Sequence, residues 1–313
     1  MQDVRSAIAQ RLHGLRAPAR VTPTRSDATA VERYWNRHTV QARDFRSARA
    51  SRRYLEWRFR EYPLFREFSG LWGAHDGEVV LDYGCGPGND LAGFAVHTRA
   101  SRIIGLDVSQ TALELAARRL ALHEDARDRV ELRRVGDGDP SIPLADGSVD
   151  HVNCQGVLHH TSHPQAILAE LARVLRPGGT ATLMVYNRDS VWFHLFTAYE
   201  RMVVEGAFAG LEVEDAFARN TDGAECPISR CYRADEFLAV CREAGFEGDF
   251  AGGYLSRREL RALESSWARA LADDRLGDEH RAFLRELVFD FRGYPLYRGR
   301  HAGIGGTYRL RRA

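Results

Sequence analysis

The stretch Leu81–Asp90, LDYGCGPGND, decides the interpretation of this 313-residue chain. It follows a short apolar run that begins at Val79 and precedes a helical pattern, so we expect it to join a buried strand to a helix. Its three glycines allow a sharp turn and a close approach of the backbone to a ligand. Their spacing departs from the dinucleotide fingerprint Gly-x-Gly-x-x-Gly, because the third glycine comes one residue early. Asp82, two residues before the first glycine, would repel a pyrophosphate and suits an amino group.

Strand and helix patterns alternate on both sides of this loop. This alternation predicts a parallel sheet with helices on both faces. Strands are expected over 79–81, 102–106, 129–133, 149–154 and 180–186, and helices over 90–98, 110–122 and 164–175. Further on, the pattern predicts a turn-rich stretch around 221–223, a helix over 235–244, a sixth strand over 246–254, charged helices over 256–290 and a seventh strand over 306–311.

The N-terminal segment has a different texture. Residues 1–30 carry two prolines that break any regular pattern, and we expect a tail of unassigned role. Residues 30–69 are rich in aromatic residues and arginine at helical spacings, which predicts two or three amphipathic helices. We therefore divide the chain into a tail and helical cap over 1–69 and a main domain over 70–313, with insertions at about 189–232 and 256–302.

Composition excludes several classes of protein. The chain contains no lysine, so all 44 basic residues are arginine, and neither a Schiff-base lysine nor a P-loop lysine is possible. A net charge of +1 argues against a dedicated nucleic-acid binder. Five irregularly spaced cysteines indicate a reducing cytoplasm rather than a disulfide framework. Cys226 and Cys231 lack a matching second pair, so we expect no metal site, and no apolar run is long enough to span a membrane.

Two more acids follow predicted strands. Asp107 ends the second strand about 20–25 residues after the loop, where an acid can accept hydrogen bonds from both hydroxyls of a ribose. Capping of the next helix is the alternative role for Asp107, although Ser109 could provide that cap. Asp137 follows the third strand and could accept a hydrogen bond from the exocyclic amine of a purine, or belong to a plain turn.

On these residues the chain resembles the class I S-adenosylmethionine-dependent methyltransferases, most clearly over residues 70–190. Asp82–Gly88 resembles the first motif of that family, Asp107 its ribose-binding acid and Asp137 its adenine contact. Three more segments resemble the fourth-strand motif, the segment after it and the turn into the fifth strand: Ser148–Val152, Gly156–His160 and Leu175–Gly179.

The resemblance implies a Rossmann-like, doubly wound sheet in the order 3-2-1-4-5-7-6, with strand 7 antiparallel, and an N-terminal helical lid. It implies S-adenosyl-L-methionine as the cofactor and in-line transfer of its methyl group to a small-molecule acceptor. We favour a hydroxyl oxygen over nitrogen or carbon as the acceptor atom, because the two adjacent histidines could take its proton. His159 and His160 are the candidate catalytic residues, or else a structural pair. The implied cofactor-binding residues are Asp82, Gly84, Gly86, Gly88, Asp107, Val108, Asp137, Gly138 and Gln155. Tyr34 is a further candidate, which either closes over the cofactor as part of the lid or packs in the core.

Two other functions stay open. A nucleic-acid or protein methyltransferase is the first alternative, although Asn153–Gly156 departs from the Asn-Pro-Pro-Tyr motif of amino-methylating DNA enzymes. A non-catalytic partner with the same fold is the second, although such proteins commonly lose the loop glycines or the ribose acid. We expect no nucleic acid and no membrane among the partners, and the pattern does not indicate the oligomeric state.

Overall fold

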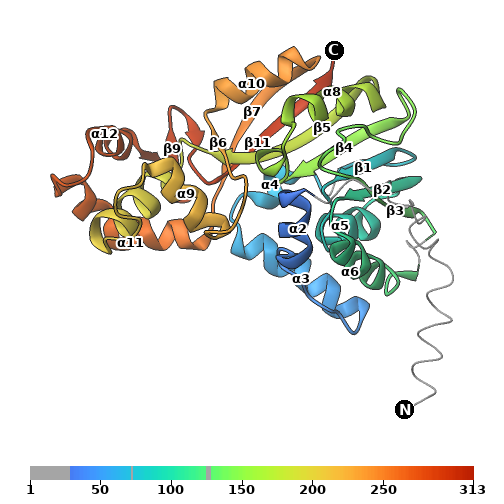
Figure 1. Ribbon diagram of the computed structural model, residues 1–313, viewed down its shortest axis with the longest axis horizontal. Helices are drawn as coiled ribbons and strands as arrows, with labels where there is room; N and C mark the ends of the chain where they lie inside the picture. The colour runs from blue at the N-terminus through green and yellow to red at the C-terminus, as the bar shows by residue number, and fades with distance from the viewer. Residues whose placement is uncertain (1–28, 72, 125–127) are drawn as a thin grey trace.

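The computed structural model describes residues 29–71, 73–124 and 128–313, so most of the expected tail over 1–30 lies outside the described residues. A mixed sheet in the order β3-β2-β1-β4-β5-β11-β7 forms its centre (Figure 1). The first five strands pair in parallel, and β11 runs antiparallel to both β5 and β7, which confirms the expected order. The strands are β1 Val79–Tyr83, β2 Arg102–Asp107, β3 Val130–Arg134, β4 Val149–Gln155, β5 Leu175–Asn187, β7 Phe246–Tyr254 and β11 Gly305–Arg312, with the short β6 Cys231–Tyr232 beside β5.

Helices cover both faces of the sheet (Figure 1). Successive side chains of a strand point to opposite faces, so Val80 packs with the helices on one side and Leu81 with those on the other. Leu81 shares its core with α8 Pro164–Val174 and α10 Ala234–Glu243. Val80 shares its core with α4 Phe65–Ser69, α5 Asn89–His97 and α6 Gln110–Leu120.

The N-terminal helices α2 Ala30–Arg37 and α3 Ala48–Glu61 pack against this second layer. Arg119 of α6 is almost fully buried and donates hydrogen bonds to the hydroxyl and the carbonyl of Ser51 in α3, at 2.8 and 3.3 Å. Leu55 of α3 is completely buried. The expected cap is therefore joined to the main domain by buried contacts.

A second lobe extends from one end of the sheet and carries α9, α11 and α12 (Figure 1). It contains the wide π-type helix η3 Trp192–Val204, followed by α9 Val213–Asp222, α11 Arg257–Ala272 and α12 Asp278–Glu286. Two expectations are corrected here. The stretch around 221–223 forms the end of α9, and a small antiparallel sheet of β8 Val288–Phe289, β9 Pro295–Tyr297 and β10 Arg300–His301 replaces the end of the charged helical pattern.

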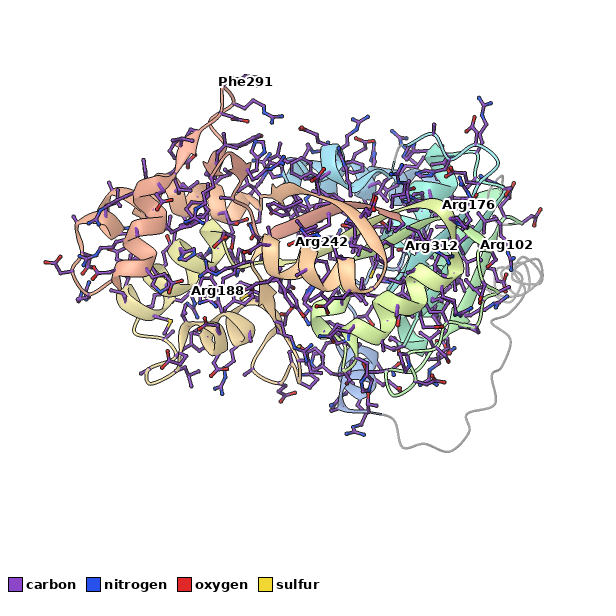
Figure 2. The ribbon with its side chains drawn as sticks, turned by 90° about the horizontal axis from the view of Figure 1, so that it is seen from above. Arg102, Arg176, Arg188, Arg242, Phe291 and Arg312 are labelled. Atoms are coloured by element: carbon purple, nitrogen blue, oxygen red, sulfur yellow. The ribbon has the colours of Figure 1, made fainter. Side chains whose placement is uncertain are left out.

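One buried carboxyl joins this lobe to the sheet. Glu259 in the first turn of α11 accepts hydrogen bonds from the backbone N–H groups of Trp192, Ser256 and Ile304. Burial raises the pKa of Glu259 to about 7. At the outer edge of the lobe, Phe291 projects away from the molecule and is 96% exposed (Figure 2).

Candidate active site

The glycine loop leaves β1 at Tyr83 and enters α5 at Asn89. Gly84 has a φ of +73°, and a Cβ there would lie 2.2 Å from a methyl carbon of Val157. Gly86 has a φ of +53°, and a Cβ there would meet none of the described atoms within 4 Å, because this residue faces a cavity. The first glycine is thus needed for packing, whereas the second leaves room for a ligand.

Asp107 faces the same cavity from the end of β2. One of its carboxylate oxygens accepts a hydrogen bond from the N–H of Gly86 and the other from the N–H of Ser109, both at 2.7 Å. The hydroxyl of Ser109 itself caps α6, so the Asp107 carboxylate is not needed for that cap. Burial raises the pKa of Asp107, although the backbone donors act in the opposite direction. Each carboxylate oxygen has a second lone pair that a vicinal diol could use.

Asp82 lies deeper in the cavity, at the end of β1. Its Oδ1 accepts a hydrogen bond from the Asn153 amide at 2.8 Å, and its buried Oδ2 has no partner among the described residues. Burial, and then the nearby Asp90 carboxylate, holds the pKa of Asp82 well above its usual range. Arg58 of α3 forms an ion pair with Asp90 at 2.5 Å, and both side chains line the cavity. An ammonium group placed between Asp82 and Asp90 would donate a hydrogen bond to the free Oδ2 of Asp82. Its positive charge would also relieve the repulsion between the two carboxylates.

Asp137 closes another side of the cavity. Its carboxylate accepts hydrogen bonds from the N–H and the hydroxyl of Ser162, at 3.0 and 2.6 Å, and its own N–H donates to Glu32 of α2 at 2.9 Å. The hydroxyl of Thr29 also donates to Asp137 at 3.2 Å. These contacts fasten α2 over the end of β3, where the sequence predicted a purine contact.

The opposite end of the cavity contains His160 and Asp222. The Nδ1–H of His160 donates to the carbonyl of Ile228 at 2.8 Å, and Nε2 lies 3.6 Å from Asp222 Oδ1. The hydroxyls of Tyr186 and Ser229 donate to the same carboxylate, at 2.8 and 2.7 Å.

The two adjacent histidines have different surroundings. His159 is completely buried, does not line the cavity and packs against Tyr186, with ring centroids 3.9 Å apart. Neither ring nitrogen of His159 has a hydrogen-bond partner among the described residues. Burial holds its pKa well below the usual range, so the imidazole is neutral. Of the two candidates, only His160 is placed to meet an acceptor in this cavity.

A single cavity of about 820 Å³ brings most of the predicted residues together. Gly88 and Gly138 are the two predicted cofactor residues that do not line it. Gly88 instead sits at the start of α5, where a Cβ would lie 3.0 Å from that of Ala116. The predicted residues that do line the cavity are Tyr34, Asp82, Gly84, Gly86, Asp107, Val108, Asp137, Gln155 and His160.

Sequence reasoning did not single out Arg58, Asp90 or Asp222. Arg58 is one of many arginines in the helical cap, and its neighbours carry no motif. Asp90 follows the glycine loop directly and lies in the first turn of α5. This position beside the loop is the feature of the sequence that could have indicated a place in the site. Asp222 lies in a stretch that looked like a turn, and only the packing of α9 places it beside His160.

Comparison with known proteins shows what this chain is similar to. Residues 81–183 match the model of the family described as Methyltransferase domain. The chain is 38% identical over 202 residues to an uncharacterized 37.1 kDa protein in transposon TN4556 of Streptomyces fradiae, covering 58% of this chain and 55% of that protein. It is 36% identical over 129 residues to the thiol S-methyltransferase TMT1B of Homo sapiens, covering 41% and 50%. It is 26% identical over 175 residues to a ubiquinone biosynthesis O-methyltransferase of Leptothrix cholodnii, covering 56% and 66%.

The strand order, the glycine loop and these matches agree. Residues 81–183 match a methyltransferase domain, and the chain is similar to class I S-adenosylmethionine-dependent methyltransferases. It spans about half to two thirds of the length of the relatives named above. Across the described residues, no helix combines the length and apolar character needed to cross a membrane.

The cavity residues fit the family's cofactor. The unpartnered oxygen of Asp82 suits the ammonium group of the cofactor's methionine part. The positively charged Arg58 suits the carboxylate of the same methionine part. Asp107 suits the ribose hydroxyls, and the absence of a side chain at Gly86 leaves room beside them.

Proposed function

We propose that this protein transfers the methyl group of S-adenosylmethionine to a hydroxyl oxygen of a small-molecule acceptor. One observation carries the proposal: a single cavity extends from Asp107 and the glycine loop to His160 and Asp222. Its volume of about 820 Å³ is in the upper part of the range for ligand pockets, about 300–1,000 Å³, which suits two ligands side by side.

In this proposal the residues near the glycine loop hold the cofactor. Asp107 receives the ribose hydroxyls, Asp82 the ammonium group and Asp137 the adenine edge. The bound cofactor supplies a methyl group on a positively charged sulfur, which is an activated leaving group. The protein's task is to align acceptor, methyl and sulfur at a separation of about 3–3.5 Å.

The acceptor end combines aromatic walls with a small polar group. Tyr34, Trp35, Tyr186 and Trp192 line the cavity around His160 and Asp222. Such a lining favours a compact apolar or aromatic acceptor with one protic nucleophile. The lone pair on Nε2 of His160 faces this space, because the Nδ1 proton is held by the Ile228 carbonyl. The two relatives with named activities act on sulfur and oxygen, respectively, and both atoms lose a proton during methylation.

Calorimetric titration with S-adenosylhomocysteine tests the cofactor part of the proposal. We expect saturable one-to-one binding to the full chain, and no binding to Gly86→Val, whose added side chain occupies the cavity. Absence of binding to the full chain would overturn the proposed function.

Transfer from cofactor with a radioactive methyl group then tests the acceptor class. Phenols, alcohols, thiols and amines of similar size serve as a matched panel. We expect transfer to hydroxyl compounds, whereas transfer confined to thiols or amines would overturn the assignment to oxygen.

A further inference from the structure

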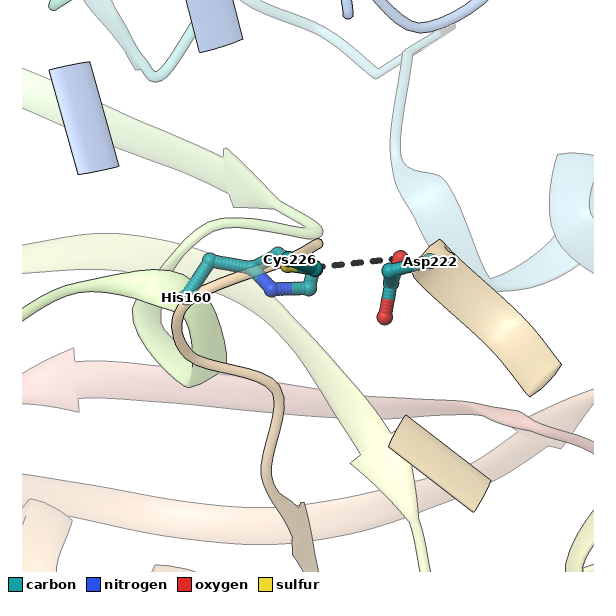
Figure 3. Close-up of side chains that lie close together, drawn as sticks. All are labelled: His160, Asp222 and Cys226. Carbon is teal, nitrogen blue, oxygen red and sulfur yellow. Dashed lines mark ion pairs between the residues drawn. The ribbon is translucent and has the colours of Figure 1, made fainter. Parts of the chain in front are cut away.

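Three potential metal ligands meet at the acceptor end of the cavity (Figure 3). They are His160 after β4, Asp222 at the end of α9 and Cys226 four residues later. Their ligand atoms all lie within 4.8 Å of one another, and His160 Nε2 is 3.6 Å from Asp222 Oδ1. The sequence did not predict this site, because Cys226 and Cys231 lack a matching second pair and His160 lies more than 60 residues before Asp222 and Cys226 in the chain.

Hydrogen bonding fixes which atoms of this cluster are available. The carbonyl of Ile228 can only accept, so His160 carries a proton on Nδ1, and in the neutral ring Nε2 holds a lone pair. The Cys226 thiol donates to the same carbonyl at 3.3 Å, and it would release its proton to solvent on binding a metal. The facing carboxylate of Asp222 is already oriented by the hydroxyls of Tyr186 and Ser229. A lone pair and a carboxylate thus face each other across 3.6 Å, and either a proton or a metal cation between them would remove the repulsion.

We propose that His160, Asp222 and Cys226 bind a divalent transition metal ion of the zinc type. Imidazole, carboxylate and thiolate are the ligands that zinc takes in proteins, at about 2.0–2.3 Å from the metal. In a tetrahedral site with such bonds, nitrogen and oxygen ligands lie about 3.3–3.5 Å apart, and the sulfur lies about 3.5–3.6 Å from each of them. The His160–Asp222 separation of 3.6 Å is close to this spacing, and the Cys226 sulfur needs to move by no more than about 1.3 Å.

The hydrogen bonds around the cluster resemble those around metal ligands in other proteins. Ile228 holds the non-ligating nitrogen of His160, and Tyr186 and Ser229 hold the carboxylate, which is the usual way in which protein groups orient metal ligands. The side chains of His160 and Asp222 are only 5% and 8% exposed, so water competes little for these ligands. Three protein ligands leave the fourth position open, as in catalytic zinc sites.

This inference rests on the proposed function, because His160 and Asp222 line the acceptor end of the cavity, from which a fourth ligand could enter. A hydroxyl of the acceptor would coordinate there and release its proton to solvent. The same oxygen would then form the new bond to the methyl carbon, while the electron pair of the broken carbon–sulfur bond stays on sulfur. On this account His160 serves as a metal ligand that helps to acidify the acceptor.

Cobalt titration of the tag-free, chelator-treated full chain tests the site. We expect one cobalt ion per chain, with a thiolate-to-cobalt charge-transfer band and the visible bands of tetrahedral coordination, both removed by added zinc. Cys226→Ser should lose the charge-transfer band. Cys231→Ser is the matched control, because this half-buried cysteine lies only five residues away, and it should keep the band.

Absence of the band in the full chain overturns the metal site, as does a band that survives in Cys226→Ser. Titration of the same samples with S-adenosylhomocysteine separates the two proposals. If cofactor binding stays normal without any cobalt band, the metal site alone fails. If the cobalt band forms but S-adenosylhomocysteine does not bind, the proposed function fails. In the active enzyme, chelation should lower methyl transfer at least 100-fold, and zinc should restore it.

Discussion

Replacement of Asp107 by asparagine tests the cofactor site most directly. In the structure the carboxylate accepts two backbone hydrogen bonds at 2.7 Å, and it has one further lone pair on each oxygen for the ribose hydroxyls. The asparagine amide has the same shape but only one accepting oxygen and no charge. A hydrogen bond to a charged group contributes about 1.5–3 kcal/mol, so we expect Asp107→Asn to weaken S-adenosylhomocysteine binding by about 10- to 150-fold.

Isothermal titration calorimetry measures this change, and urea unfolding measures the stability of the same sample. Burial already disfavours the Asp107 charge, so the free energy of unfolding should fall by no more than about 1–2 kcal/mol. Asp139→Asn is the control, because this exposed carboxylate also accepts a backbone hydrogen bond, from Ser141 in the turn after β3. Asp139 does not line the cavity, so its replacement should leave the affinity unchanged. A folded Asp107→Asn protein whose affinity stays within twofold of wild type would remove Asp107 from the cofactor site.

Four further variants test the two loop glycines, the buried contact of the helical cap and the buried carboxyl of Glu259. Gly86→Ala should weaken S-adenosylhomocysteine binding at least tenfold in calorimetry, because its methyl group enters the cavity; unchanged affinity would place the cofactor elsewhere. Gly84→Ala should instead cost about 1–3 kcal/mol in urea unfolding through its clash with Val157, and an unaltered midpoint would contradict the packing. Arg119→Met should cost about 1–3 kcal/mol, because it leaves the hydroxyl and the carbonyl of Ser51 in α3 without their buried donor; a neutral result would detach the cap from the core. Because burial raises the pKa of Glu259 to about 7, the folded protein retains this proton to higher pH than the unfolded chain, and its contribution to stability is lost as pH rises from about 4.5 to 7. Between pH 5 and 8 the free energy of unfolding of Glu259→Gln should therefore rise relative to wild type by about 2–3 kcal/mol, and a constant difference would refute the raised pKa.

The amino-acid sequence by itself determined the central architecture and the cofactor end of the site. The apolar runs, the helix starts at Ser109 and Pro164 and the glycine loop are local signals, since each depends on residues within one or two turns of chain. The acids at 82 and 107 follow strands that end at the same edge of a parallel sheet. Their meeting in one cavity therefore follows from topology, without knowledge of side-chain packing.

Only the tertiary structure decided the composition of the acceptor end. Asp222 and Cys226 come from a lobe whose helices are held by their own core, and nothing in their local sequence indicates which strand end they approach. Similarly, Arg58 meets Asp90 only because α3 packs on α5 and α6. Packing also separated the two adjacent histidines, since a short turn of 3₁₀ helix directs His160 into the cavity and buries His159 behind it. Such long-range contacts depend on how the helices pack, and this packing is the result of many weak interactions between residues far apart in the chain. A local sequence pattern therefore does not predict them.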